Sequence, residues 1–185
     1  MTTPLRPGDQ RSDTDLLEAW KAGEEAAATE LVYRHGKPLA RFLGAAGAGV
    51  REDIEDLVQE TFVRAFRRIE TFRGGSSFRT WLMTIGSNVL KDAWRKRKRG
   101  RVIPLDDREI VDGSSDPHGD AVAGDIAMRV GRCVQGLPRL QRDVFLLRAQ
   151  QGLDYEEIAQ ALDTTPGSAR VHYHHAVKRL KDMLE

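Results

Sequence analysis

The residues best suited to chemistry in this chain are the basic and aromatic side chains between Phe72 and Arg101. Six of the eight residues from Trp94 to Arg101 are Lys or Arg, and a glycine–serine loop at 72–77 precedes them. Lys and Arg bind phosphate groups without reading sequence, whereas aromatic rings and guanidinium planes stack on unpaired bases. This segment therefore predicts contact with a nucleic acid.

The sequence holds no pattern that predicts catalysis or a bound metal. It contains no nucleophile–base pair and no glycine-rich phosphate loop followed by Lys-Ser/Thr. His172, His174 and His175 are close in sequence, but no carboxylate or thiol lies nearby on their helix face. The single cysteine, Cys133, allows no intramolecular disulfide and no cysteine-based zinc site. We expect no enzymatic activity, no catalytic residue, no metal site and no cofactor.

An amphipathic helix is predicted directly before the loop, over 51–70. Its apolar stripe consists of Ile54, Leu57, Val58, Thr61, Phe62, Ala65, Phe66 and Ile69. This spacing of three and four residues marks one buried face of a helix. The opposite face carries Asp56, Gln59, Glu60, Arg64 and Arg67. Because an acidic face stands next to a basic, aromatic segment, the two together indicate an adaptor between a protein and a nucleic acid.

The remaining pattern predicts an all-α fold of two small helical domains joined by a flexible acidic linker. Helices near 13–22, 24–43 and 78–99 join the acidic helix in a first domain at 13–100, with a kink or break at Pro38. Residues 101–123 have linker composition, with seven acids and one base between Pro104 and Asp125. A second helical domain follows at 124–185.

The last 35 residues predict a helix-turn-helix. Asp154 and Glu157 form a capping box that begins one helix, and Thr165 followed by Pro166 begins the next. The free side of the second helix suits the major groove of DNA. A purely structural helical hairpin is the alternative.

No apolar run approaches the about 20 residues of a membrane span. The N-terminus also lacks the apolar core of a signal peptide. We therefore expect a soluble, cytoplasmic protein.

Both halves together resemble the extracytoplasmic-function (group IV) sigma factors of bacterial RNA polymerase, in the sigma-70 family. The resemblance spans about 13–184 and rests on DIEDLVQETFVRAFRRIETF, SSFRTWLMTIGSNVLKDAWRKRKR, LPRLQRDVFLLRAQQGLDYEEIAQAL and SARVHYHHAVKRL. It implies a subunit without catalysis that directs core RNA polymerase to specific promoters and aids their opening. Region 2 would occupy 13–100 and region 4 would occupy 124–185.

The resemblance also implies binding residues for each partner. The β′ coiled coil of core polymerase would bind Asp56, Gln59 and Glu60, and region 4 would contact the β flap. The −10 element would be bound by Phe72, Arg73, Ser76, Ser77, Asn88, Lys91, Asp92, Arg95 and Arg97. The −35 element would be bound by Ser168, Arg170, Val171, His172, His175 and Lys178. Many members have Arg or Lys where this chain has His172 and His175, which leaves its −35 sequence open. An anti-sigma factor is a further conceivable partner.

Two other classes compete with this interpretation. A standalone helix-turn-helix regulator would explain the C-terminal half, but it does not need the polar face of the acidic helix. A small helical enzyme would need catalytic residues that the sequence lacks.

Overall fold

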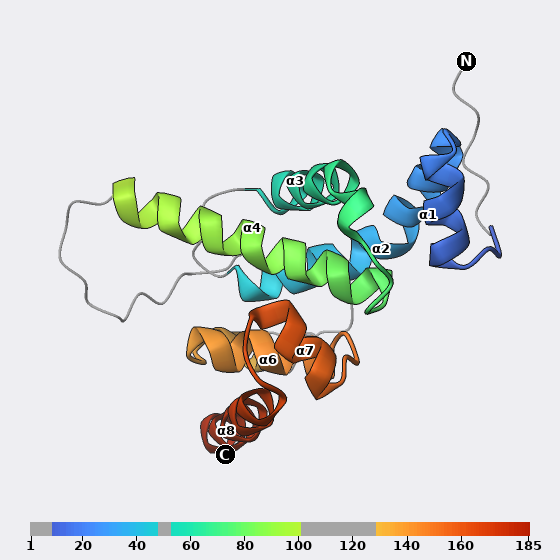
Figure 1. The fold of residues 1–185 in the computed structure, drawn as a ribbon. Helices are drawn as coiled ribbons and strands as arrows, with labels where there is room; N and C mark the ends of the chain where they lie inside the picture. Colours follow the sequence, from blue (N-terminus) through green and yellow to red (C-terminus); the bar gives the residue numbers. More distant parts are fainter. Residues whose placement is uncertain (1–8, 48–52, 101–128) are drawn as a thin grey trace, which may run out of the picture.

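The computed structural model describes residues 9–47, 53–100 and 129–185. All regular elements in these ranges are helices, as Figure 1 shows, which confirms the all-α prediction. The expected linker at 101–123 lies outside the described residues. The helices of the first half are α1 (Asp13–Lys21), α2 (Glu25–Ala46), α3 (Ile54–Arg67), the 3-10 turn η1 (Ile69–Thr71) and α4 (Phe78–Gly100). Those of the second half are a helical segment at 129–135, α6 (Arg139–Ala149), α7 (Tyr155–Leu162) and α8 (Pro166–Leu184).

Side-chain caps fix where several of these helices begin. Asp154 and Glu157 form the predicted capping box of α7, and Thr165 caps α8 with Pro166 in the first turn. Asp163, between the two helices, adopts the left-handed conformation at φ 56°, which Asp tolerates better than most residues. The predicted helix-turn-helix is therefore present.

The acidic helix is shorter than predicted. α3 ends at Arg67, and Ile69 lies in η1, where the Thr71 N–H donates to the carbonyl of Arg68 (2.8 Å). Tight turns of this kind are frequent at helix ends. The stripe itself is confirmed: Leu57, Thr61, Phe62, Ala65 and Ile69 are buried, while Ile54, Val58 and Phe66 are half-buried.

Of the kink or break expected at Pro38, the break is absent, because α2 runs without interruption through this residue. A proline inside a helix costs about 3 kcal/mol. Leu31 before it and Leu39, Phe42 and Leu43 after it are all fully buried. Packing on both sides of the proline therefore holds the two parts of α2 in one helix.

The two halves pack against each other, which the sequence did not predict. Figure 1 shows α6 and α7 between α8 and the pair α2 and α4. Thr80 Oγ1 on α4 donates to Glu157 Oε1 on α7 (2.6 Å). Gln151 accepts from Arg79 Nη2 (2.8 Å) and donates to the Pro38 carbonyl (3.1 Å). A single apolar core runs through both halves.

α6 also buries a carboxyl group. Asp143 is 3% exposed, and its Oδ1 accepts no hydrogen bond from any described residue. Arg139 pairs with the other carboxylate oxygen, and its Nε lies 3.6 Å from Oδ2. Burial raises the pKa of Asp143 to about 6, against the opposing charges of Arg139, Arg142 and Lys91. Because the charge of Lys91, on α4, acts on the Asp143 carboxyl, this carboxyl lies near the contact between the halves.

Candidate functional site

The exposed face of α3 carries the three residues expected to bind polymerase. Asp56, Gln59 and Glu60 are all exposed, on the side opposite the buried stripe. Asp56 and Gln59 make no side-chain hydrogen bond or ion pair within the described ranges. Their positions leave them available to a partner.

Glu60 differs because it already pairs within the chain. Arg64 Nε donates to Glu60 Oε1 (2.7 Å), and Arg64 Nη1 donates to Asp92 Oδ2 on α4 (2.8 Å). Asp92 and Glu60 together raise the pKa of Arg64. Asp92 also lies 3.4 Å from Arg95. One guanidinium thus connects a predicted polymerase-binding residue with a predicted DNA-binding residue.

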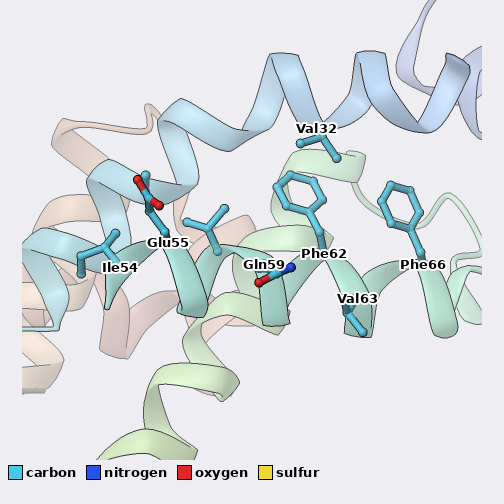
Figure 2. Close-up of a pocket in the computed structure, with 9 residues that line it drawn as sticks. Val32, Ile54, Glu55, Gln59, Phe62, Val63 and Phe66 are labelled. Atoms are coloured by element: carbon cyan, nitrogen blue, oxygen red, sulfur yellow. The ribbon is translucent and has the colours of Figure 1, made fainter. Parts of the chain in front are cut away.

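An apolar groove of about 460 Å³ borders this face, between α2 and α3 (Figure 2). Its apolar lining consists of Val32, Ala40, Ile54, Val58, Phe62, Val63 and Phe66, and Glu55 and Gln59 complete it. Val32 is 39% exposed. Gly36 lies one helical turn from both Val32 and Ala40, and a Cβ added there would meet no atom within 4 Å.

Sequence reasoning missed this groove. Val32 and Val63 are apolar residues that stand beside the buried stripes of their helices. The sequence feature that could have indicated the groove is therefore the presence of more apolar residues on α2 and α3 than their buried stripes need. A sequence alone does not say whether such residues are covered.

The loop before α4 is built from aromatic packing and a serine cap. The Phe72 ring lies 5.3 Å from Trp81 and 6.1 Å from Phe78. Ser77 Oγ accepts from the Thr80 N–H (3.1 Å) and thereby caps the start of α4. Gly74 has φ 71°, a conformation that favours glycine.

The predicted −10 residues fall into two groups. In the loop, Arg73 and Ser77 are exposed, and Phe72 and Ser76 are half-buried. On α4, Asn88, Asp92 and Arg95 are exposed and recur at helical spacing, with Lys91 half-buried beside them. Arg97 lies in the last turns of α4, and its side chain is outside the described part of the structure.

The predicted −35 residues lie on α8. Arg170, Val171, His175 and Lys178 are exposed, with Val171 at 53%, whereas Ser168 and His172 are half-buried. The Nδ1 atom of His172 is buried and has no hydrogen-bond partner among the described residues. The buried side of the helix is formed by Ala169, Ala176 and Leu180.

The described ranges show neither a candidate metal site nor a membrane-spanning helix. They contain no group of three His, Cys, Asp or Glu side chains placed to hold a metal ion. No described helix combines the length and the apolar character needed to cross a membrane.

Comparison with known proteins decides the family. Residues 31–100 match the family model "Sigma-70 region 2", and residues 127–180 match "Sigma-70, region 4". The ECF RNA polymerase sigma-E factor of Haemophilus influenzae is 31% identical over 186 residues, covering 96% of this chain and 95% of that protein. The chain belongs to the extracytoplasmic-function sigma factors of the sigma-70 family. The ECF RNA polymerase sigma-E factor of Escherichia coli K12 is 30% identical over 174 residues, which cover 88% of each chain.

Solved structures agree with this assignment. CnrH, in complex with the cytosolic domain of CnrY, superposes with a TM-score of 0.69 at 27% identity, covering 94% of this chain and 97% of CnrH. The sigma factor RpoE, in complex with the anti-sigma factor NepR from Bartonella quintana, has the same fold, with a TM-score of 0.66 at 23% identity over 84% of this chain and 95% of RpoE.

The sigma factor therefore binds DNA and acts in transcription initiation together with core RNA polymerase. It is not an enzyme, as predicted. The competing classes, a standalone regulator and a small enzyme, are excluded by the family.

Proposed function

We propose that this sigma factor binds core RNA polymerase through the exposed face of α3 and brings it to promoters that have separate −10 and −35 elements. The observation that carries the proposal is the position of three polar side chains on the exposed face of α3. Asp56, Gln59 and Glu60 stand in solvent, backed by a buried stripe and bordered by the groove against α2.

The proposed occupant of this surface is the β′ coiled coil of core polymerase. An amphipathic helix binds a groove by placing apolar side chains at helical spacing into it. Glu55 and Gln59 line the groove, and Asp56 adds charge next to them. A helix with an apolar ridge and flanking basic residues complements this surface in shape and in charge. In the second half, the β flap is the proposed contact of region 4.

The −10 element is assigned to the loop and to the exposed face of α4. Phe72, Arg73, Ser76 and Ser77 would take an unpaired base, because rings and guanidinium planes stack on bases in single strands. Asn88 and Asp92 offer polar atoms beside them. Lys91, Arg95 and Arg97 would bind phosphates and contribute affinity without sequence choice.

The −35 element is assigned to α8 in the major groove. Ser168, Arg170, Val171, His172, His175 and Lys178 are the proposed contacts. Because His172 is half-buried whereas Arg170 and His175 are exposed, Arg170 and His175 are the members of this set most accessible to DNA.

An anti-sigma factor is the further proposed partner, because CnrH and RpoE were each solved in complex with another protein, which for RpoE is the anti-sigma factor NepR. We place the sigma factor in the cytoplasm, where bacterial polymerase transcribes. Co-expression with the product of an adjacent gene should yield a complex that no longer binds core polymerase, and a complex that still binds polymerase would contradict this role.

The polymerase contact is tested by Asp56→Lys. Because Asp56 is exposed and has no described partner, but lies in the first turn of α3, the change should lower the free energy of unfolding by no more than about 1 kcal/mol. Binding of labelled protein to purified core polymerase should be lost. Glu70→Lys makes the same charge change at an exposed position in η1 and should bind normally. Equal binding by both variants would refute the assignment.

The groove is tested separately by Gly36→Leu. A Cβ at Gly36 would meet no atom within 4 Å, and replacing a helical glycine favours the helix by up to about 1 kcal/mol. The variant should fold at least as well as the wild type and should bind core polymerase more weakly, because the leucine side chain would extend toward the groove between Val32 and Ala40. Gly36→Ala is the matched control, with full binding expected. Undiminished binding by Gly36→Leu would exclude the groove from the interface.

A further inference from the structure

One aromatic ring in the helix-turn-helix contacts two arginine side chains. Tyr155 is the first residue of α7. The Cζ of Arg148, near the end of α6, lies 5.1 Å from the ring centroid, and the Cζ of Arg170, on α8, lies 5.2 Å from it. Both distances fall within the about 6 Å of a cation–π contact. Tyr155 therefore connects α7 to an outward side chain of the helix proposed to read DNA.

The Tyr155 ring is itself held in place. It lies edge-on to Tyr173, with centroids 6.3 Å apart, and Tyr173 stacks on Phe145 at 6.1 Å. The three rings come from α7, α8 and α6. The capping box of Asp154 and Glu157 also fixes the backbone where the tyrosine begins α7. The ring is thus a fixed platform.

Arg170 has no other anchor within the described ranges. It is exposed and forms no ion pair with a described carboxylate. A free arginine side chain would lose much rotamer freedom on binding DNA. Contact with the ring restricts this freedom before DNA is present, and preorganisation of this kind lowers the cost of binding.

The type of contact matters as much as its position. A carboxylate would also order Arg170, but it would neutralise the charge and occupy the N–H donors. An aromatic ring takes only the flat face of the guanidinium, so the donors at its edge stay free. A base edge or a phosphate can then accept from them.

We propose that Tyr155 is a positioning residue for promoter recognition, whose ring holds the guanidinium of Arg170 ready to donate to the −35 DNA. This inference rests on the proposed function of α8. It concerns a residue outside the recognition helix, which does not itself need to touch the DNA.

The test is a double-mutant cycle in the holoenzyme formed by the full chain and core polymerase. The probe is a promoter duplex selected by the wild-type holoenzyme from a library with a random −35 region. Tyr155→Leu should weaken binding about two- to five-fold, as expected for a cation–π contact at an exposed site. Tyr155→Phe keeps the ring and should bind like the wild type.

The decisive measurement is the effect of Tyr155→Leu in an Arg170→Ala background, where it should vanish. A purely structural role of Tyr155 would weaken binding equally in both backgrounds and would overturn the inference. Equal losses for Tyr155→Phe and Tyr155→Leu would also overturn it. If Tyr155→Leu lowers the melting temperature, Tyr155→Met, which can still pack on Tyr173, replaces it in the cycle.

The same experiment separates this inference from the proposed function. Normal binding by Arg170→Ala would remove Arg170 from the −35 contacts and the inference with it. Weak binding by Arg170→Ala with normal binding by Tyr155→Leu would leave the −35 assignment intact and refute the positioning role alone.

Discussion

Replacing Asp143 with Asn should stabilise this protein at neutral pH, although the substitution removes a charged residue next to two arginines. The carboxyl is 3% exposed, and its Oδ1 accepts no hydrogen bond from any described residue. A buried charge without hydrogen bonds destabilises the folded state. Asparagine has nearly the same shape and can be buried without a charge.

The size of this stabilisation and its dependence on pH follow from the raised pKa of Asp143. Its value is about 6 in the folded protein, against 3.8 for a free side chain. Below pH 3.8 the group is protonated in both states, so it adds no penalty. As pH rises from there to 6, the unfolded chain ionises first and stability falls, then levels off. At about 1.4 kcal/mol for each pH unit, the penalty reaches at most about 3 kcal/mol.

The assay is urea unfolding of the wild type and Asp143→Asn at several pH values from 4 to 8. The variant should gain little at pH 4 and up to about 3 kcal/mol at pH 7 and above. Asp182→Asn, at an exposed position on α8, is the control and should show no such trend. A loss of stability in Asp143→Asn at pH 7 would mean that attraction to Arg139, Arg142 and Lys91 outweighs the burial, which would refute the reasoning.

Three further predictions use the same structure. Phe62→Ala should lower the free energy of unfolding by about 3–5 kcal/mol, because the ring is buried; a smaller loss in urea unfolding would mean that the site collapses around the cavity. Neutralising Arg95 and Arg97 together should reduce the log–log salt slope of holoenzyme binding to −10 DNA by about two, and an unchanged slope would place both outside the DNA contact. Thr80→Val should destabilise the protein by about 1.5–3 kcal/mol by removing the bond to the Glu157 carboxylate, while Thr80→Ser should retain most of the stability; equal losses would assign the effect to packing.

Local structure could be predicted from the sequence because its causes lie within a few residues. The start of α8 depends on Thr165 and Pro166, and that of α7 depends on Asp154 and Glu157. The buried face of α3 follows from the spacing of its apolar residues. The exposed face, with Asp56, Gln59 and Glu60, follows by exclusion.

Contacts between distant segments could not be predicted in this way. Gln151 is polar and follows a helix end, which is typical of a surface residue, yet it is 3% exposed because α4 and α2 cover it. Asp143 would also be placed on the surface by its type. Arg64 is correctly placed on the polar face of α3, but its bond to Asp92 depends on how α3 crosses α4. Periodicity shows which face of a helix is covered but not what covers it.

The contact between Thr80 and Glu157 sets a limit on how far this arrangement can reach along DNA. Promoter elements at −10 and −35 are about 25 base pairs apart, or about 85 Å at about 3.4 Å per pair. α8 is only about 28 Å long at about 1.5 Å per residue, and it packs on α7, whose Glu157 lies 2.6 Å from Thr80 on α4. If one molecule engages both elements as proposed, the halves of this packed arrangement would have to separate to span that distance. The free energy of the broken contacts would then lower the apparent affinity for the promoter.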